Sequence, residues 1–308
     1  MLKFIVRRIF WTIPVLLAVI FLTFMMMRQI GGNPFRHTER AVPEAVQANL
    51  ERKFHVNDPW WKQYAFYVKG VATLDFGPSL VLRGQTVNDI IKEHFPKSIE
   101  LGVYAFLFAI VVGVPLGMIA ALRQNTWVDY SAMFFSNVFH ALPSFLVATL
   151  MIYFIALKAG LLPTSGWTSW EHKLLPAIAL GFAPMALFAR LVRGTMLETL
   201  QQDYVRTARA KGLRYRRVVG LHVLRNSLIP VITAAGPLLG FIITGAFVIE
   251  LIFNIPGIGQ YYVTAVNARD YSVVMGLTVL LSVIIIIANL IVDILYGILD
   301  PRTRDART

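Results

Sequence analysis

The chain has 308 residues, with 29 Lys or Arg against 17 Asp or Glu, and its formal net charge is +12. Only 15% of the residues are charged and 56% are hydrophobic, whereas soluble domains average roughly 25% charged residues. This composition excludes an ordinary soluble domain and a disordered chain. The absence of cysteine excludes disulfides, thiolate metal sites and cysteine nucleophiles.

Six uncharged runs are long enough, or nearly so, to cross a membrane as helices. A hydrocarbon core of about 30 Å needs roughly 20 apolar residues in a helix. The third run contains Pro143, which predicts a kinked helix. The fourth run is the shortest, and Lys173 at its start can extend it by snorkelling. We predict an all-α polytopic membrane protein with six transmembrane helices, at 9–27, 101–122, 130–157, 174–189, 226–249 and 271–292.

The distribution of charge predicts the orientation. The segment 190–225 carries nine Lys or Arg and two acidic residues, a net +7. With the N-terminus inside, the inner segments together carry +11 and the outer segments +3, as the positive-inside tendency requires. Glu250 and Asp293, at the ends of the last two runs, contribute the remaining −2. The basic excess therefore reports topology and does not indicate nucleic acid. Both termini are expected in the cytoplasm, with 1–30 holding the first span and 31–100 an extracytoplasmic insertion.

The insertion is too long to lack structure. Its pattern predicts a helix over 43–54, a break at Asn57-Asp58-Pro59, and a second helix over 60–70 that opens with two Trp. The aromatic cluster is favoured as an anchor at the outer membrane interface, the alternative being a surface that receives a partner. Thr86 starts a further short helix, which is expected to end before Pro96.

The basic segment predicts two short helices separated by a glycine. Residues 194–211 are helix-compatible and stop at Gly212, a residue type suited to follow a helix C-terminus, and 213–226 are helix-compatible again. Cations crowd the end of the first helix, where they complement the helix dipole. A loop that is basic only because it lies on the cytoplasmic side would not need two helices. We therefore favour a docking element for a partner on the inner side.

This segment carries a family resemblance. It has Y-V-R-T-A-R-A-K-G-L over 204–213 and L-R-N-S-L-I-P over 224–230. The pattern resembles the E-A-A…G…P loop of ATP-binding-cassette importer permeases, in its peptide-permease form. Similar patches recur at 75–79 (D-F-G-P-S), 256–260 (P-G-I-G-Q) and 300–302 (D-P-R). Over essentially its full length the chain looks most like the B-type membrane subunit of an oligopeptide permease, with dipeptide, glutathione and nickel relatives as alternatives.

The resemblance implies a type I importer permease fold of the MetI-like kind, with residues 101–308 as the core and a cytoplasmic coupling loop at 190–226. That loop would be pushed by partner ATPase subunits. One feature departs from the general pattern: Arg206-Thr207-Ala208 stands where the wider family has E-A-A, so a docking contact that needs a carboxylate there is in doubt. The implied coupling-loop residues are Tyr204, Arg206, Thr207, Ala208, Arg209, Ala210, Lys211, Gly212, Leu213, Arg225, Asn226 and Pro230.

The implied partners are a second permease subunit, two ATPase subunits and an extracytoplasmic peptide-binding protein, in a bacterial inner membrane and with peptide as substrate. No cofactor is expected in this chain, because the Gly-Lys dipeptide of the phosphate-binding loop occurs nowhere. ATP and Mg²⁺ would be bound by the partners, and the chain would not be an enzyme.

Further residues were weighed for the transport path. Glu250, at the end of the fifth run, fits either a structural ion pair or cap, or a position near the peptide path. Pro256, Gly257 and Gly259 form a tight turn and are candidates for an outer gate. The G-x-x-x-G pairs at 113–117 and 236–240 predict close helix packing.

Two other classes of protein are less well supported. An ion-coupled secondary transporter would predict repeats and paired coupling acids within the spans. We find no internal repeat and only two acids, Glu250 and Asp293, at the ends of the runs. An intramembrane enzyme would need a catalytic set that the sequence lacks, such as H-E-x-x-H or a cysteine nucleophile.

Overall fold

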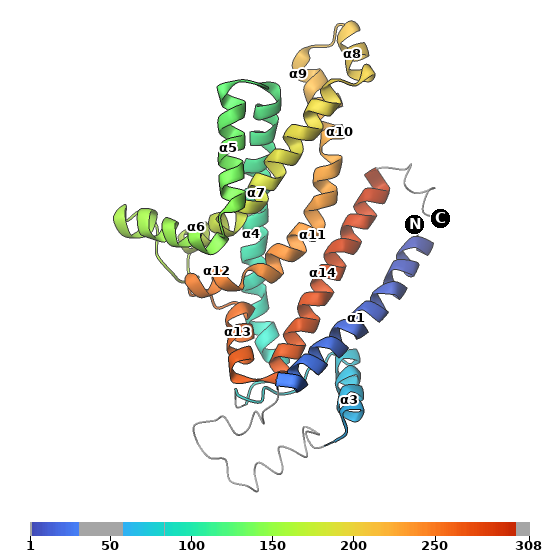
Figure 1. The fold of residues 1–308 in the computed structure, drawn as a ribbon, viewed down its shortest axis with the longest axis vertical. Helices are drawn as coiled ribbons and strands as arrows, with labels where there is room; N and C mark the ends of the chain where they lie inside the picture. The colour runs from blue at the N-terminus through green and yellow to red at the C-terminus, as the bar shows by residue number, and fades with distance from the viewer. Residues whose placement is uncertain (1, 31–57, 83, 300–308) are drawn as a thin grey trace. The chain divides into compact units, whose positions relative to one another are not determined.

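The computed structural model describes residues 2–30, 58–82 and 84–299, which are almost entirely helical (Figure 1). The helix expected over 43–54 lies outside the described residues. The chain divides into two compact units, which we treat separately. Of the described residues, unit 1 contains 99–255 and 287–299, and unit 2 contains those up to Ser98 together with 256–286.

The prediction of a polytopic helical membrane protein is confirmed. Among the described residues, five helices are long and apolar enough to span a membrane, or six if a sharply bent pair counts as one span. The spans lie in α1 (Leu2–Ile30), α4 (Val87–Leu122), α7 (Trp170–Leu200), α11–α12 (Ile229–Gly245 and Phe247–Ile252) and α14 (Tyr271–Leu299). The weakest predicted run, 174–189, is therefore the centre of a longer helix, since polar residues at both ends continue it.

The third predicted span is not one kinked helix. It consists of α5 (Trp127–Ala141) and α6 (Ser144–Met151), continued by the π-helical segment η2 (Ile152–Lys158), with a bend of 105° between the two halves. Leu142, at the bend, has extended backbone angles, the conformation that a following proline favours. Pro143 thus ends one helix and precedes the next.

The expected helix end before Pro96 is wrong. Helix α4 begins where predicted, with a reciprocal cap in which Asp89 N donates to Thr86 Oγ1 (3.1 Å) and Thr86 N donates to Asp89 Oδ2 (3.0 Å). It then continues through Pro96 to Leu122. A proline inside a helix removes one backbone donor, and membrane helices tolerate this where neighbours re-satisfy the backbone.

In unit 1, α4 and α7 pack with their backbones close together. A Cβ atom at Gly113 would lie 2.5 Å from the Met185 carbonyl oxygen, and one at Gly117 would collide with the carbonyl oxygen of Ala189. From the opposite helix, a Cβ at Gly181 would lie 2.7 Å from the Ala105 carbonyl oxygen. The close packing predicted from the G-x-x-x-G pair at 113–117 is therefore confirmed, and its partner is α7.

Unit 2 is built from α1, α3 (Trp60–Ala72), the first turns of α4, α13 (Ile258–Ala268) and the first part of α14. Helix α3 begins directly after Pro59, as predicted. Its Tyr64 hydroxyl donates to the Leu17 carbonyl of α1 at 3.2 Å, and its ring meets Phe21 edge-on. The core of the unit includes Met27, Val87, Ile90, Ile258 and Leu277. Trp60 and Trp61 stay exposed, so the interfacial anchor remains a prediction.

Candidate functional site

The segment between α7 and α11 folds into a helical hairpin at one end of unit 1, which we call the loop hairpin (residues 201–227; Figure 1). Its outgoing arm is α8 (Asp203–Ala210). Its returning arm is α9 (Tyr215–Arg217), η3 (Val218–Leu224) and α10 (Arg225–Ser227). The single helix expected over 194–211 is in fact two, because α7 ends at Leu200 and a turn at Gln201 and Gln202 separates it from α8.

The turn of the hairpin lies at Gly212, as the sequence predicts. Gly212 has a φ of +77°, the left-handed region that favours glycine. Its N–H donates to the Arg209 carbonyl at 2.9 Å, and the Leu213 N–H donates to the Ala208 carbonyl at 3.4 Å. These bonds satisfy the last carbonyls of α8 and direct the chain back toward η3.

The two arms are joined by a small apolar interface. Val205 and Ala208, three residues apart on α8, are buried in a cluster that includes Val218, Val219 and Val223 of the returning arm. Since residues at this spacing share one helix face, the opposite face of α8 points outward. Ala208, one of the predicted coupling residues, therefore packs inside the hairpin.

Most of the other predicted coupling residues lie on the surface of the hairpin. Asn226 Nδ2 donates to the Tyr204 hydroxyl at 2.8 Å, which links the two arms on their exposed side. The Arg209 guanidinium lies over the Tyr215 ring, 5.3 Å from its centroid. The predicted residues with exposed positions are Tyr204, Arg206, Thr207, Arg209, Ala210, Lys211, Gly212, Arg225, Asn226 and Pro230, while Leu213 is half-buried.

The exposed face of the hairpin is strongly basic. Arg214, Arg216 and Arg217 add to the cations of α8 and are also exposed. Within 201–227 the only acidic residue is Asp203, whose carboxylate lies 3.8 Å from the Arg206 guanidinium. Exposed pairs of this kind contribute little to stability. The face therefore presents a surplus of positive charge to any partner that covers it.

Sequence reasoning missed how α7 holds the hairpin. The Thr195 hydroxyl donates to the Ser227 carbonyl at 2.9 Å, and the Ser227 hydroxyl lies 3.2 Å from the hydroxyl of Thr199. Ser227 is buried. These bonds fasten the last turns of α7 to the end of the returning arm. The sequence contains a weak signal for them, because Thr195 and Thr199 are four residues apart and share one helix face.

A buried ion pair in the same region was also missed. Arg193 of α7 binds Asp129 of α5 through both carboxylate oxygens, with Nε to Oδ1 at 2.5 Å and an Nη atom to Oδ2 at 2.7 Å. Asp129 is 1% exposed. In the sequence these residues count only as loop charges, and 64 positions separate them. The available signal is the acid in the first turn of α5, where it complements the helix dipole.

The residues predicted for the outer path fall in both units. Glu250 is fully buried within α12 of unit 1. Pro256, Gly257 and Gly259 belong to unit 2, where they lead into α13. Two side chains of α4 hold that turn: His94 Nδ1 lies 3.0 Å from the Pro256 carbonyl oxygen, and Ser98 Oγ accepts from the Ile258 N–H at 3.0 Å. The turn is therefore a fixed structure.

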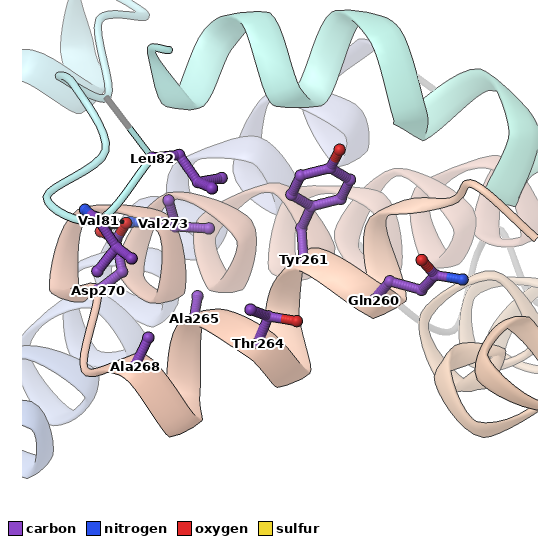
Figure 2. A pocket seen from close by; sticks show the side chains of 9 residues that line it. All are labelled: Val81, Leu82, Gln260, Tyr261, Thr264, Ala265, Ala268, Asp270 and Val273. Atoms are coloured by element: carbon purple, nitrogen blue, oxygen red, sulfur yellow. Dashed lines mark hydrogen bonds between the residues drawn. The ribbon is translucent and has the colours of Figure 1, made fainter. Parts of the chain in front are cut away.

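Unit 2 also contains a cavity of about 120 Å³ beside α13 (Figure 2). Its lining is mainly apolar, with Gln260, Tyr261 and Thr264 as polar members, and burial raises the pKa of Tyr261. Asp270 at its edge accepts hydrogen bonds from the Ser79 hydroxyl and from the Leu80, Val81 and Val273 N–H groups. This carboxylate is thus used to hold the 79–81 segment, and the cavity offers little chemistry beyond apolar contact.

No metal-binding set appears among the described residues. Within 2–30, 58–82 and 84–299, no group of three or more His, Cys, Asp or Glu is placed to hold a metal ion. What unit 1 does offer is a basic helical hairpin held rigidly to a bundle of membrane-length helices. Fold and site together define a polytopic membrane protein with a basic helical hairpin at one end of the bundle in unit 1.

Comparison with known proteins gives the family. The model of the binding-protein-dependent transport system inner membrane component matches residues 113–305, and the model of the N-terminal part of such components matches residues 1–102. The chain belongs to this family of binding-protein-dependent transport system inner membrane components. Membership favours a transport component over an intramembrane enzyme or an ion-coupled secondary transporter.

Curated relatives match along the full chain. It is 47% identical to the dipeptide transport system permease protein DppB of Bacillus subtilis, over 99% of this chain and 98% of that protein. It is 46% identical to the oligopeptide transport system permease protein OppB of Salmonella typhimurium, over 99% of this chain and 100% of that protein. Relatives of the two kinds therefore match about equally well.

The solved structures that match show the fold. A chain of the MetNI methionine ABC transporter, solved in inward-facing conformations, superposes with a TM-score of 0.57 at 16% identity. The match covers 68% of this chain and 96% of that chain. The predicted MetI-like type I importer permease fold is confirmed.

Proposed function

We propose that this chain is a permease subunit of an ATP-binding-cassette importer that carries peptides inward across the bacterial inner membrane. One observation carries the proposal: the R-T-A-R-A-K-G segment forms the second half of α8 and the turn that follows it, with every residue except Ala208 exposed. It does so in a chain whose relatives are named for dipeptide and oligopeptide transport. Oligopeptides are the proposed substrates, and dipeptides are the nearest alternative.

The loop hairpin is the proposed seat of an ATPase subunit. Its buried apolar residues belong to a cluster shared with α7, so we expect binding to depend mainly on its exposed polar face. That face combines an aromatic ring, Tyr204, with cations at Arg206, Arg209 and Lys211. A partner cleft lined with carboxylates would complement this charge and speed association. ATP and Mg²⁺ would bind to the two ATPase partners, which hydrolyse the nucleotide.

The proposed orientation places the hairpin and both chain termini in the cytoplasm. The loop charge supports it, because short basic loops stay on the cytoplasmic side. The 58–82 segment and α13 then belong to the outer side, where an extracytoplasmic binding protein would deliver peptide. A second permease subunit would complete the pathway, as one bundle of six spans is small to enclose a peptide-sized channel.

Uptake by the assembled transporter in proteoliposomes tests this function. Labelled tripeptides and tetrapeptides should accumulate only when ATP and the binding protein are present. Uptake of Ni²⁺ or glutathione without uptake of any peptide would overturn the proposed substrate class.

A charge variant tests the docking face. Replacing Arg206, Arg209 and Lys211 with Gln should weaken ATPase binding and flatten its dependence on salt concentration. Lys62→Gln, which removes an exposed cation from α3 in unit 2, is the matched control and should leave ATPase binding unchanged. Equal loss in both variants would refute the assignment of the face.

A further inference from the structure

The Asp129–Arg193 pair joins two elements that lead to different places in unit 1. Asp129 lies in the first turn of α5, which leads to the bend at Pro143 and on to α6. Arg193 lies on α7, within two helical turns of Thr195 and Thr199. Both of these residues contact Ser227 of the loop hairpin. The pair therefore lies where force from the hairpin would enter the helix bundle.

The geometry of the pair makes it hard to separate. Both carboxylate oxygens of Asp129 are engaged by the guanidinium, and Oδ2 also accepts from the Asn125 N–H at 3.1 Å. Asn125 has a φ of +61°, so the same carboxylate stabilises a tight turn between α4 and α5. Because Asp129 is buried, moving α5 away from α7 would leave an uncompensated charge.

Other contacts along this boundary are weaker. Arg190 Nη1 lies 3.4 Å from Asn137 Oδ1, which is long for a hydrogen bond and lies on the exposed side of the helices. The ring of Phe139 on α5 stacks on that of Phe182 on α7, with centroids 4.2 Å apart. Apolar contacts of this kind allow sliding because the hydrophobic effect is not directional. Among the hydrogen bonds between the described residues of these two helices, the Asp129–Arg193 pair is the one that involves a fully buried group.

We propose that Asp129 and Arg193 are positioning residues that make α5 move together with the loop hairpin. The chain of contact runs from the hairpin through Ser227 to α7, and from Arg193 to Asp129 on α5. A push on the hairpin would then be delivered to α5 and to the bend that follows it. The role in transport rests on the proposed function, while the mechanical link itself does not.

Spin-label distances test the mechanical link directly. The chain has no cysteine, so labels can be placed at Ser131→Cys on α5 and Lys211→Cys on the hairpin without removing native thiols. Both positions are exposed. With Asp129 and Arg193 intact, the labels at positions 131 and 211 should give a narrow distance distribution in nanodiscs. Asp129→Asn should broaden or shift it, and Arg193→Lys, which retains the charge but loses the two-point contact, should show a smaller effect.

Two controls separate this effect from damage to the fold. Asp203→Asn breaks an exposed pair in the hairpin and should leave the 131–211 distance unchanged. Labels at Thr207→Cys and Arg225→Cys, both within the hairpin, should report the same distance with and without Asp129→Asn. An unchanged 131–211 distribution in Asp129→Asn would overturn the proposal, and so would equal changes in the intra-hairpin pair.

The consequence for transport is a loss of coupling. In the assembled transporter, Asp129→Asn should lower the peptide moved per ATP hydrolysed by about fivefold or more while hydrolysis continues. Lys62→Gln should retain the normal ratio. An unchanged ratio in Asp129→Asn would refute the positioning role. Absence of peptide uptake by the unmodified transporter would instead refute the proposed function, and the distance measurements would still stand.

Discussion

Gly212 offers the sharpest test of the hairpin structure. Its φ of +77° costs an L-residue roughly 1–2 kcal/mol, and a β-branched side chain is the least suited to that region. A Cβ at this position meets no atom within 4 Å. Gly212→Val should therefore destabilise the turn through backbone strain alone, without a steric clash. A change of 1–2 kcal/mol corresponds to about a 5- to 30-fold larger open population.

Hydrogen exchange measures that population. The Gly212 and Leu213 N–H groups are bonded to the Arg209 and Ala208 carbonyls, so peptides spanning 204–217 should exchange about 5- to 30-fold faster in Gly212→Val. Gly212→Asn should stay close to the unmodified chain, because Asn tolerates the left-handed region. Gly194→Ala is the matched control: it also meets no atom, lies within a helix, and should not increase exchange. Unchanged exchange in Gly212→Val would refute the assigned turn.

Three further predictions follow from other parts of the chain. Gly117→Val should lower the melting temperature of the purified chain by forcing α4 away from the Ala189 carbonyl, whereas Gly220→Ala, which meets no atom, should have a small effect. Asp270→Asn should loosen the 79–81 segment, at a cost of about 1.5–3 kcal/mol for each charged hydrogen bond that is weakened. Hydrogen exchange at the Leu80 and Val81 N–H groups should become faster, and unchanged exchange would contradict the role of Asp270 as an anchor. A phosphatase reporter fused after Thr308 should be inactive, because the C-terminus is proposed to be cytoplasmic, and activity there would contradict the orientation.

The membrane helices were predictable because hydropathy alone selects them. The number of apolar residues sets the spans, and most of each predicted run is helical in the structure, although the third run is broken at Leu142 and Pro143. Effects of proline were less predictable. Pro143 breaks its helix with a bend of 105° while Pro96 is absorbed within α4. A proline restricts only its own and the preceding residue, so the outcome depends on the packing around it, which the local sequence does not contain.

The loop hairpin was predictable at its turn and unpredictable at its start. Gly212 predicts the turn directly, because a glycine after the basic end of a helix is a strong signal that the helix stops. Gln201 and Gln202 contain no helix breaker, so nothing local separates α7 from α8. The separation has a structural cause: α8 must turn to bury Val205 and Ala208 against η3. A tertiary contact here overrides a compatible local propensity.

Helix α7 connects several features that are far apart in the sequence. Its glycine-lined contact with α4, its ion pair with α5 and its hydroxyl contacts with the hairpin lie along one helix. Each uses a different kind of interaction. Together they hold α7 in place, so we expect the bend after α5 to be the part of unit 1 that moves most easily. If α7 is the rigid member, movement of the bundle should concentrate at Leu142 and Pro143 and not at Pro176 or Pro184 inside α7. The helix buries Pro176 and Pro184, and a membrane helix tolerates a proline where its neighbours re-satisfy the freed backbone groups.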